Sequence, residues 1–267
     1  MPVDTVPLDV VRLDLRLRRR AVLGYCLGLA AYVFVVVALY PTFKDETSLN
    51  EFTQNGSKLA ALFGAAGSLT SPAGWLSANV YANFLPLIAL VLAMGYGASC
   101  LAGQDEDGTL ALVATLPARR RTILQQKIAV LVLHAACASL ATLAVVLAGR
   151  AFQLDLDLGP ILGATAATML LAIDFGLLAL LIGAWTGSRG TALGVAAGAA
   201  SASYLIGSLA PVTHWLHPLR YASLFYWSVG NNQLQHGLGA SAVLALAGTA
   251  VILAATAVPA FNRLDIH

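Results

Sequence analysis

Two ionisable residues lie inside long apolar stretches of the sequence. Asp174 stands near the middle of the run 161–185, and His134 lies within the run 128–147. If these runs cross a membrane, a charge at the centre costs about 2.5–3.5 kcal/mol, so such residues usually face the bundle interior. Asp174 is therefore either a carboxylate that binds a cation or gates a path, or a hydrogen-bonded residue that fixes helix packing. A direct pair with His134 would need helix tilt or a bridging water.

A hydroxyl and an imidazole could also form a nucleophile and its base. The segment Gly97-Ala98-Ser99-Cys100 together with His134 resembles the active site of rhomboid intramembrane proteases. Cys100 replaces the glycine expected after the serine, and the order of the runs differs, so we expect no catalytic residues. The three cysteines, at 26, 100 and 137, have unrelated spacings, which predict neither a metal site nor a disulfide framework.

Composition predicts that the chain is an all-α integral membrane protein. Its 267 residues are 58% apolar and 10% charged, and the mean hydropathy is +0.78, whereas soluble domains carry about 25% charged residues. A helix needs about 20 apolar residues to cross the hydrocarbon core, and nothing here alternates as barrel strands do. Six such runs cover residues 21–40, 84–101, 128–147, 161–185, 191–209 and 238–258, the last closed by Pro259.

The basic residues set the predicted orientation, with both termini in the cytosol. That orientation gives the cytosolic segments eleven of the fifteen Lys and Arg residues and the outer segments four. The net charge of +2 is too small to indicate a nucleic-acid partner. The eleven are Arg12, Arg16, Arg18, Arg19, Arg20, Arg119, Arg120, Arg121, Lys127, Arg189 and Arg263.

Two segments outside the six runs have distinctive patterns. Residues 1–20 place apolar and arginine side chains on different helical faces, which predicts an amphipathic helix lying along the inner leaflet. The rest, 21–267, is then a single six-helix domain. Its outer segment 211–237 is rich in aromatic residues, which fits an interfacial belt or a re-entrant helix covered by protein or water.

The inner loop between the second and third runs predicts a short helix near 105–118. Acidic residues precede an apolar stretch, where they favour a helix N-terminus. Pro117 then stops the helix, because its ring removes a donor and clashes with the preceding turn. A segment that only set the topology would not need these start and stop signals.

This loop resembles that of the type-2 ABC exporter permeases. The shared residues are Glu106-Asp107-Gly108-Thr109-Leu110, then Leu116-Pro117-Ala118-Arg119-Arg120 and Lys127, although Arg119 stands where the family has Ser or Thr. Weaker resemblances are His217-Pro218-Leu219-Arg220-Tyr221 before the last run and Phe261-Asn262-Arg263-Leu264-Asp265 after it.

The resemblance implies a permease half-subunit in the bacterial plasma (inner) membrane. It implies a homodimer or a paralogous pair whose second and fifth spans line the path. It also implies two copies of a separate ABC ATPase, which would bind ATP and Mg²⁺, since this sequence has no G-x-x-x-x-G-K-[ST] loop. The coupling residues carried over are Glu106, Gly108, Thr109, Leu110, Pro117, Arg119 and Arg120.

The sequence leaves open the role of the spaced glycines, the role of Asp174 and the substrate. Gly190, Gly194 and Gly198 recur at intervals of four and permit close helix approach, either within one subunit or between two. Asp174 also motivates an ion-coupled secondary transporter, although such folds usually show internal repeats and none is clear here. The sequence does not indicate a substrate, because the predicted path-lining side chains are small and apolar.

Overall fold

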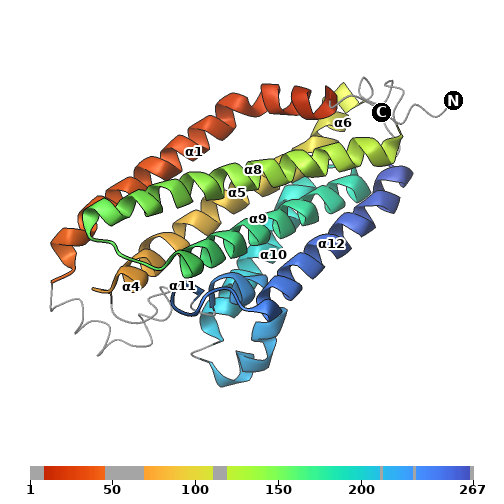
Figure 1. Ribbon diagram of the computed structural model, residues 1–267. Helices are drawn as coiled ribbons and strands as arrows, with labels where there is room; N and C mark the ends of the chain where they lie inside the picture. The colour runs from red at the N-terminus through yellow and green to blue at the C-terminus, as the bar shows by residue number, and fades with distance from the viewer. Residues whose placement is uncertain (1–8, 46–68, 111–118, 211–212, 231–232, 265–267) are drawn as a thin grey trace.

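The computed structural model describes residues 9–45, 69–110, 119–210, 213–230 and 233–264. These residues form helices and connecting turns and contain no strand, and six of the helices are long and apolar enough to cross a membrane (Figure 1). The spanning stretches are Val10–Phe43, Pro72–Glu106, Arg120–Phe152, Leu158–Thr186, Arg189–Leu209 and Ala240–Arg263. The six predicted spans are confirmed.

Helix α9, Leu158–Thr186, forms the centre of the bundle. It packs against α5 (Phe84–Ala98), α8 (Arg120–Ala148), α10 (Arg189–Leu209) and α12 (Ala240–Arg263). In the most apolar 18 residues of each span, 72% are buried in the second and fourth spans but only 17% in the fifth and sixth. The exposed apolar faces of α10 and α12 therefore need lipid or another protein as a cover.

Helix α1, Asp9–Phe43, joins the predicted amphipathic helix and the first span without a break at residue 20. Its first turns bury Val10 and Asp14, with Val11 and Leu15 partly buried beside them, while Leu17 is exposed. The helix continues because no glycine or proline interrupts residues 9–23. Whether residues 9–20 lie along a membrane surface stays a prediction.

The second span is built from several helical pieces: α4 (Pro72–Leu76), η1 (Ser77–Tyr81), α5, η2 (Ser99–Gly103) and α6 (Gln104–Glu106). Both η1 and η2 are π-helical turns, a rare geometry that occurs often at functional sites. The span is longer than its apolar core 84–101 because these flanking pieces extend it at both ends.

The prediction that Pro259 closes the last span was wrong. Helix α12 runs through Pro259 and ends at Arg263. Proline removes one helical hydrogen bond, but the last turn is held from outside, because Arg120 of α8 donates to the carbonyls of Phe261 and Leu264.

The described part of the aromatic segment forms short helices: η4 (His214–Ala222), η5 (Tyr226–Gly230) and α11 (Gln233–His236). They pack against α9 and α10 at the end of the bundle where α9 begins. Ser223, Phe225 and Ser228 are buried there. Protein therefore covers these residues, as a re-entrant segment requires, and its depth in a membrane stays a prediction.

Candidate functional site

One end of the bundle gathers most of the residues singled out in the sequence. Helix α1 begins there, α12 ends there, and α6 lies beside them (Figure 1). We call this the terminal end, and define it by the first turns of α1, α6 with the turn after it, the first turns of α8 and the last turns of α12.

A buried polar network joins four elements at the terminal end. The Lys127 ammonium group donates to Asp14 Oδ2 at 3.2 Å and to Gln104 Oε1 at 2.7 Å. The Tyr96 hydroxyl donates to the same Asp14 oxygen at 2.7 Å, and Gln104 Nε2 donates to the other oxygen at 3.3 Å. The Asp14 and Lys127 side chains are 3% and 0% exposed. The guanidinium of Arg18 lies 5.1 Å from the centre of the Tyr96 ring.

Such a network fixes the relative positions of its helices. A buried charge that loses its partner is strongly destabilised, so α1, α5, α6 and α8 cannot separate here without a large cost. The sequence suggested Lys127 only through a family pattern and did not indicate Asp14. Asp14 is the single acidic residue among the five arginines of residues 12–20, which is the signal that could have drawn attention to it.

Glu106 connects the end of the second span to the fifth span. Its Oε1 accepts from the backbone N–H of Arg189, the first residue of α10, at 2.8 Å. The N–H groups of a helix's first turn lack partners within the helix and carry partial positive charge, so a carboxylate is favoured there. Glu106 therefore caps a helix distant in the chain, and Ser188 completes the cap through the Thr191 N–H.

The structure describes only the beginning of the segment predicted to form a short helix near 105–118. Gly108 has φ +69°, a left-handed conformation that favours glycine. Thr109 is exposed and its hydroxyl donates to the Gln104 carbonyl at 3.2 Å. Leu110 is 1% exposed and packs in the core with Val10, so it anchors the turn. Residues 111–118, including Pro117, lie outside the described part of the chain.

The two arginines after that gap differ. Arg119 is exposed, whereas Arg120 Nη1 lies 2.9–3.3 Å from the carbonyl oxygens of Phe261, Asn262 and Leu264. Its guanidinium also lies 5.8 Å from the centre of the Phe261 ring. A cation is favoured at a helix C-terminus. Arg120 therefore fastens α12 to α8, and two stretches that carried the family resemblance meet here.

The intramembrane residues Asp174 and His134 are not brought together. Asp174 is fully buried in α9, and neither carboxylate oxygen has a hydrogen-bond partner among the described residues. His134 is 1% exposed, its two ring nitrogens are likewise without a described partner, and its ring packs edge-on against Tyr96 at 4.9 Å.

The proposed protease pair is not formed either. The Ser99 hydroxyl donates to the Gly95 carbonyl of its own helix at 2.5 Å, and His134 accepts no bond from it. A nucleophile needs a base within hydrogen-bond reach, so this arrangement does not activate Ser99.

An apolar groove of about 590 Å³ lies between α5 and α10. Its polar groups are few: the Tyr204 hydroxyl donates to Asn83 Oδ1 at 3.3 Å, and Ser201 lies nearby in the lining. Ligand sites commonly combine an apolar lining with a small number of polar groups that orient the ligand. The apolar lining comprises Ala82, Phe84, Leu87, Leu90, Val91, Met94, Ala197, Ala200, Leu205 and Phe225.

Comparison with protein families gives a match over residues 8–266, nearly the whole chain, to the family described as ABC-2 family transporter protein. The chain belongs to this family. It is thus a multi-pass membrane protein and an ABC transporter permease, of a family that generally pairs with an ABC ATPase. A comparison with curated proteins gave no match.

The face of α10 that carries the regularly spaced glycines is open. A Cβ added at Gly190, Gly194 or Gly198 would meet nothing within 4 Å among the described residues. Packing within the subunit, one of the two alternatives for these glycines, is therefore not observed. The tight crossing lies elsewhere, because a Cβ at Gly97 of α5 would stand 2.1 Å from the Gly176 carbonyl oxygen of α9. No pattern in the sequence pairs these two glycines.

Proposed function

We propose that this ABC-2 permease is half of an ATP-driven exporter in a bacterial plasma membrane. Two copies, or one copy and a paralogue, enclose the path, and two ABC ATPase subunits supply ATP hydrolysis with Mg²⁺. The terminal end faces the cytosol and receives the ATPase. Export is favoured by the family resemblance of the loop between the second and third spans, with its coupling-helix pattern at Glu106–Leu110.

The observation that carries this proposal is the set of contacts made by residues 104–110. Gln104 hydrogen-bonds to both Asp14 and Lys127, and Glu106 caps α10. Between these contacts and the buried Leu110, Thr109 and its neighbours remain exposed. A force on this exposed turn would thus reach α1, α8 and α10 through bonds that are expensive to break.

A force that moves α10 would act on the groove between α5 and α10. Helix α10 forms one wall of the groove and α5 the other, and Glu106 holds the first residue of α10. A shift of α10 relative to α5 would change the width of the groove and the Tyr204–Asn83 contact at its polar spot. Apolar lining with one polar pair suits an amphipathic cargo.

A test that needs no known cargo uses the groove itself. The permease, with its three native cysteines replaced and Ser201→Cys introduced, is co-purified with a candidate ABC ATPase and placed in lipid. We expect ATP with vanadate to change the maleimide labelling rate at position 201 several-fold.

Glu106→Ala, which removes the acceptor of the Arg189 N–H, should remove most of that change while the complex still assembles and hydrolyses ATP. Asp107→Ala, which removes the neighbouring exposed acid, serves as the control and should behave as the parent. If the labelling rate ignores ATP in an intact complex, or if both substitutions act alike, the proposed coupling is wrong.

A further inference from the structure

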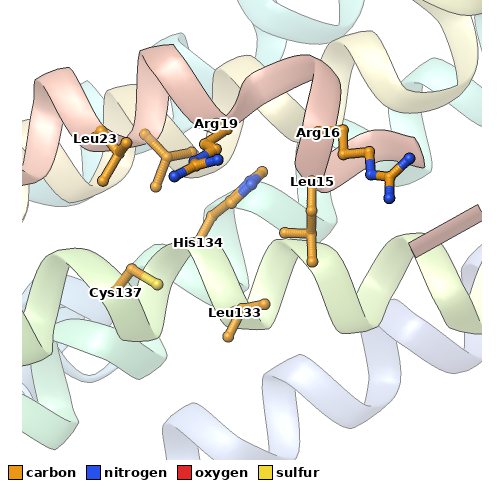
Figure 2. Close-up of a pocket in the computed structure, with 8 residues that line it drawn as sticks. Leu15, Arg16, Arg19, Leu23, Leu133, His134 and Cys137 are labelled. Atoms are coloured by element: carbon orange, nitrogen blue, oxygen red, sulfur yellow. The ribbon is translucent and has the colours of Figure 1, made fainter. Parts of the chain in front are cut away.

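A second groove, of about 240 Å³, lies between α1 and α8. Its walls are Leu15, Val22 and Leu23 from α1 and Leu133 and Cys137 from α8, with His134 between them (Figure 2). Leu23 and Leu133 are 48% and 42% exposed, so the groove opens sideways from the bundle. A groove that opens sideways from a membrane-spanning bundle is accessible to lipid.

Two arginines border the same groove. Arg16 and Arg19 stand one turn apart on α1 and are both exposed. No described residue forms a salt bridge with either, since the acid of this part of α1, Asp14, is paired with Lys127. Arg19 and His134 are turned towards the same space, with Leu15 on the far side of the ring (Figure 2).

His134 lies beneath the groove. It is almost fully buried, yet both ring nitrogens lack a partner among the described residues. A neutral imidazole has one N–H donor and one acceptor, and a buried donor without an acceptor is costly. The groove is thus an apolar channel above a buried imidazole, bordered by two exposed arginines whose guanidinium groups point in opposite directions along α1 (Figure 2).

We propose that this groove binds an anionic phospholipid. The phosphate lies against Arg16 and Arg19, where guanidinium groups suit phosphate oxygens. One acyl chain follows Val22, Leu23 and Cys137 towards the bilayer centre. Leu23 is seven residues beyond Arg16, about 10 Å along the helix, which is the direction an acyl chain takes from its headgroup.

The groove fits a phospholipid better than it fits a free anion in a water-filled site. Below the arginines the groove is apolar and open to the membrane, which suits an acyl chain. A basic cluster at the start of a span attracts anionic lipid headgroups. The inference does not depend on the ATPase, so it is testable on the permease alone.

The experiment is native mass spectrometry of the detergent-purified full chain with phosphatidylglycerol and with phosphatidylcholine of the same acyl chains. We expect phosphatidylglycerol to be retained preferentially. The double variant Arg16→Gln/Arg19→Gln should weaken its binding about 30-fold, following the typical contribution of two basic residues near a lipid surface. The matched control Arg12→Gln/Arg20→Gln removes the same charge from exposed positions outside the groove and should leave retention within about twofold.

Two further arms decide whether the groove itself is used. Cys137→Phe fills the apolar part while both arginines remain, and should also lower phosphatidylglycerol retention. Millimolar inorganic phosphate should not displace the lipid. Equal losses in the two arginine pairs, retention unaffected by Cys137→Phe, or full displacement by phosphate would each overturn the proposal.

Discussion

Asp14 and Asp174 are both buried carboxylates, but their surroundings differ completely. Asp14, at the terminal end, accepts hydrogen bonds from Lys127, Tyr96 and Gln104. Asp174, in the middle of the bundle, has no described partner. Around Asp174 the helices are held by close packing instead, as at the Gly97–Gly176 crossing two residues further along α9. The terminal end thus has a fixed polar geometry, while the middle has one polar group that no described contact fixes.

The sharpest test of this contrast removes the cation of the buried pair. Lys127→Met should lower the free energy of unfolding by about 3–5 kcal/mol, because it leaves Asp14 buried without a counter-charge. Denaturant or thermal unfolding in detergent measures this loss. Arg121→Gln, an exposed cation on the same helix, should have little effect. Equal stability of the two variants would show that the buried network does not stabilise the terminal end.

The middle of the bundle should instead be sensitive to a single methyl group. Gly97→Ala places a Cβ against the Gly176 carbonyl and should cost about 1–3 kcal/mol of unfolding free energy. Gly95→Ala, where a Cβ meets nothing within 4 Å, is the matched control for helix propensity and should not destabilise. A tolerated Gly97→Ala would show that α5 and α9 do not touch at this crossing.

At the terminal end, Arg120→Gln removes a smaller contribution. We expect a loss of about 1–2 kcal/mol, since the last carbonyls of α12 lose a charged donor that also favours the helix dipole. Hydrogen exchange should be faster at the amides of residues 260–264. Arg119→Gln, with an exposed side chain, should leave that exchange unchanged, and matching behaviour of the two variants would contradict the assigned contact.

Asp174→Asn should change stability least, by less than about 1 kcal/mol, because no described hydrogen bond or ion pair is lost. Asp14→Asn, the same substitution at the other carboxylate, should cost several times more, since it leaves Lys127 unpaired. Comparable losses in the two unfolding measurements would erase the distinction. If Asp174 serves transport, its substitution abolishes flux while assembly remains intact.

The sequence predicted the broad architecture well, because six long apolar runs have few solutions in a membrane. It failed where tertiary packing decides. Asp14 and Lys127 are 113 residues apart and resemble ordinary charges at span ends. Pro259 by itself predicts a helix stop, and the sequence does not reveal that Arg120, 139 residues earlier, donates to the carbonyls of the last turn. For Glu106, family resemblance indicated importance but not that its carboxylate caps α10.

The most direct test of the central claim asks where the ATPase docks. A photo-crosslinking amino acid replaces the exposed Thr109 at the terminal end or, as the control, the exposed Leu219 at the opposite end. In an intact complex with an ABC ATPase, irradiation should join the ATPase to the chain from position 109 and not from 219. Crosslinking from 219 alone, or from neither position in an intact complex, would contradict the account.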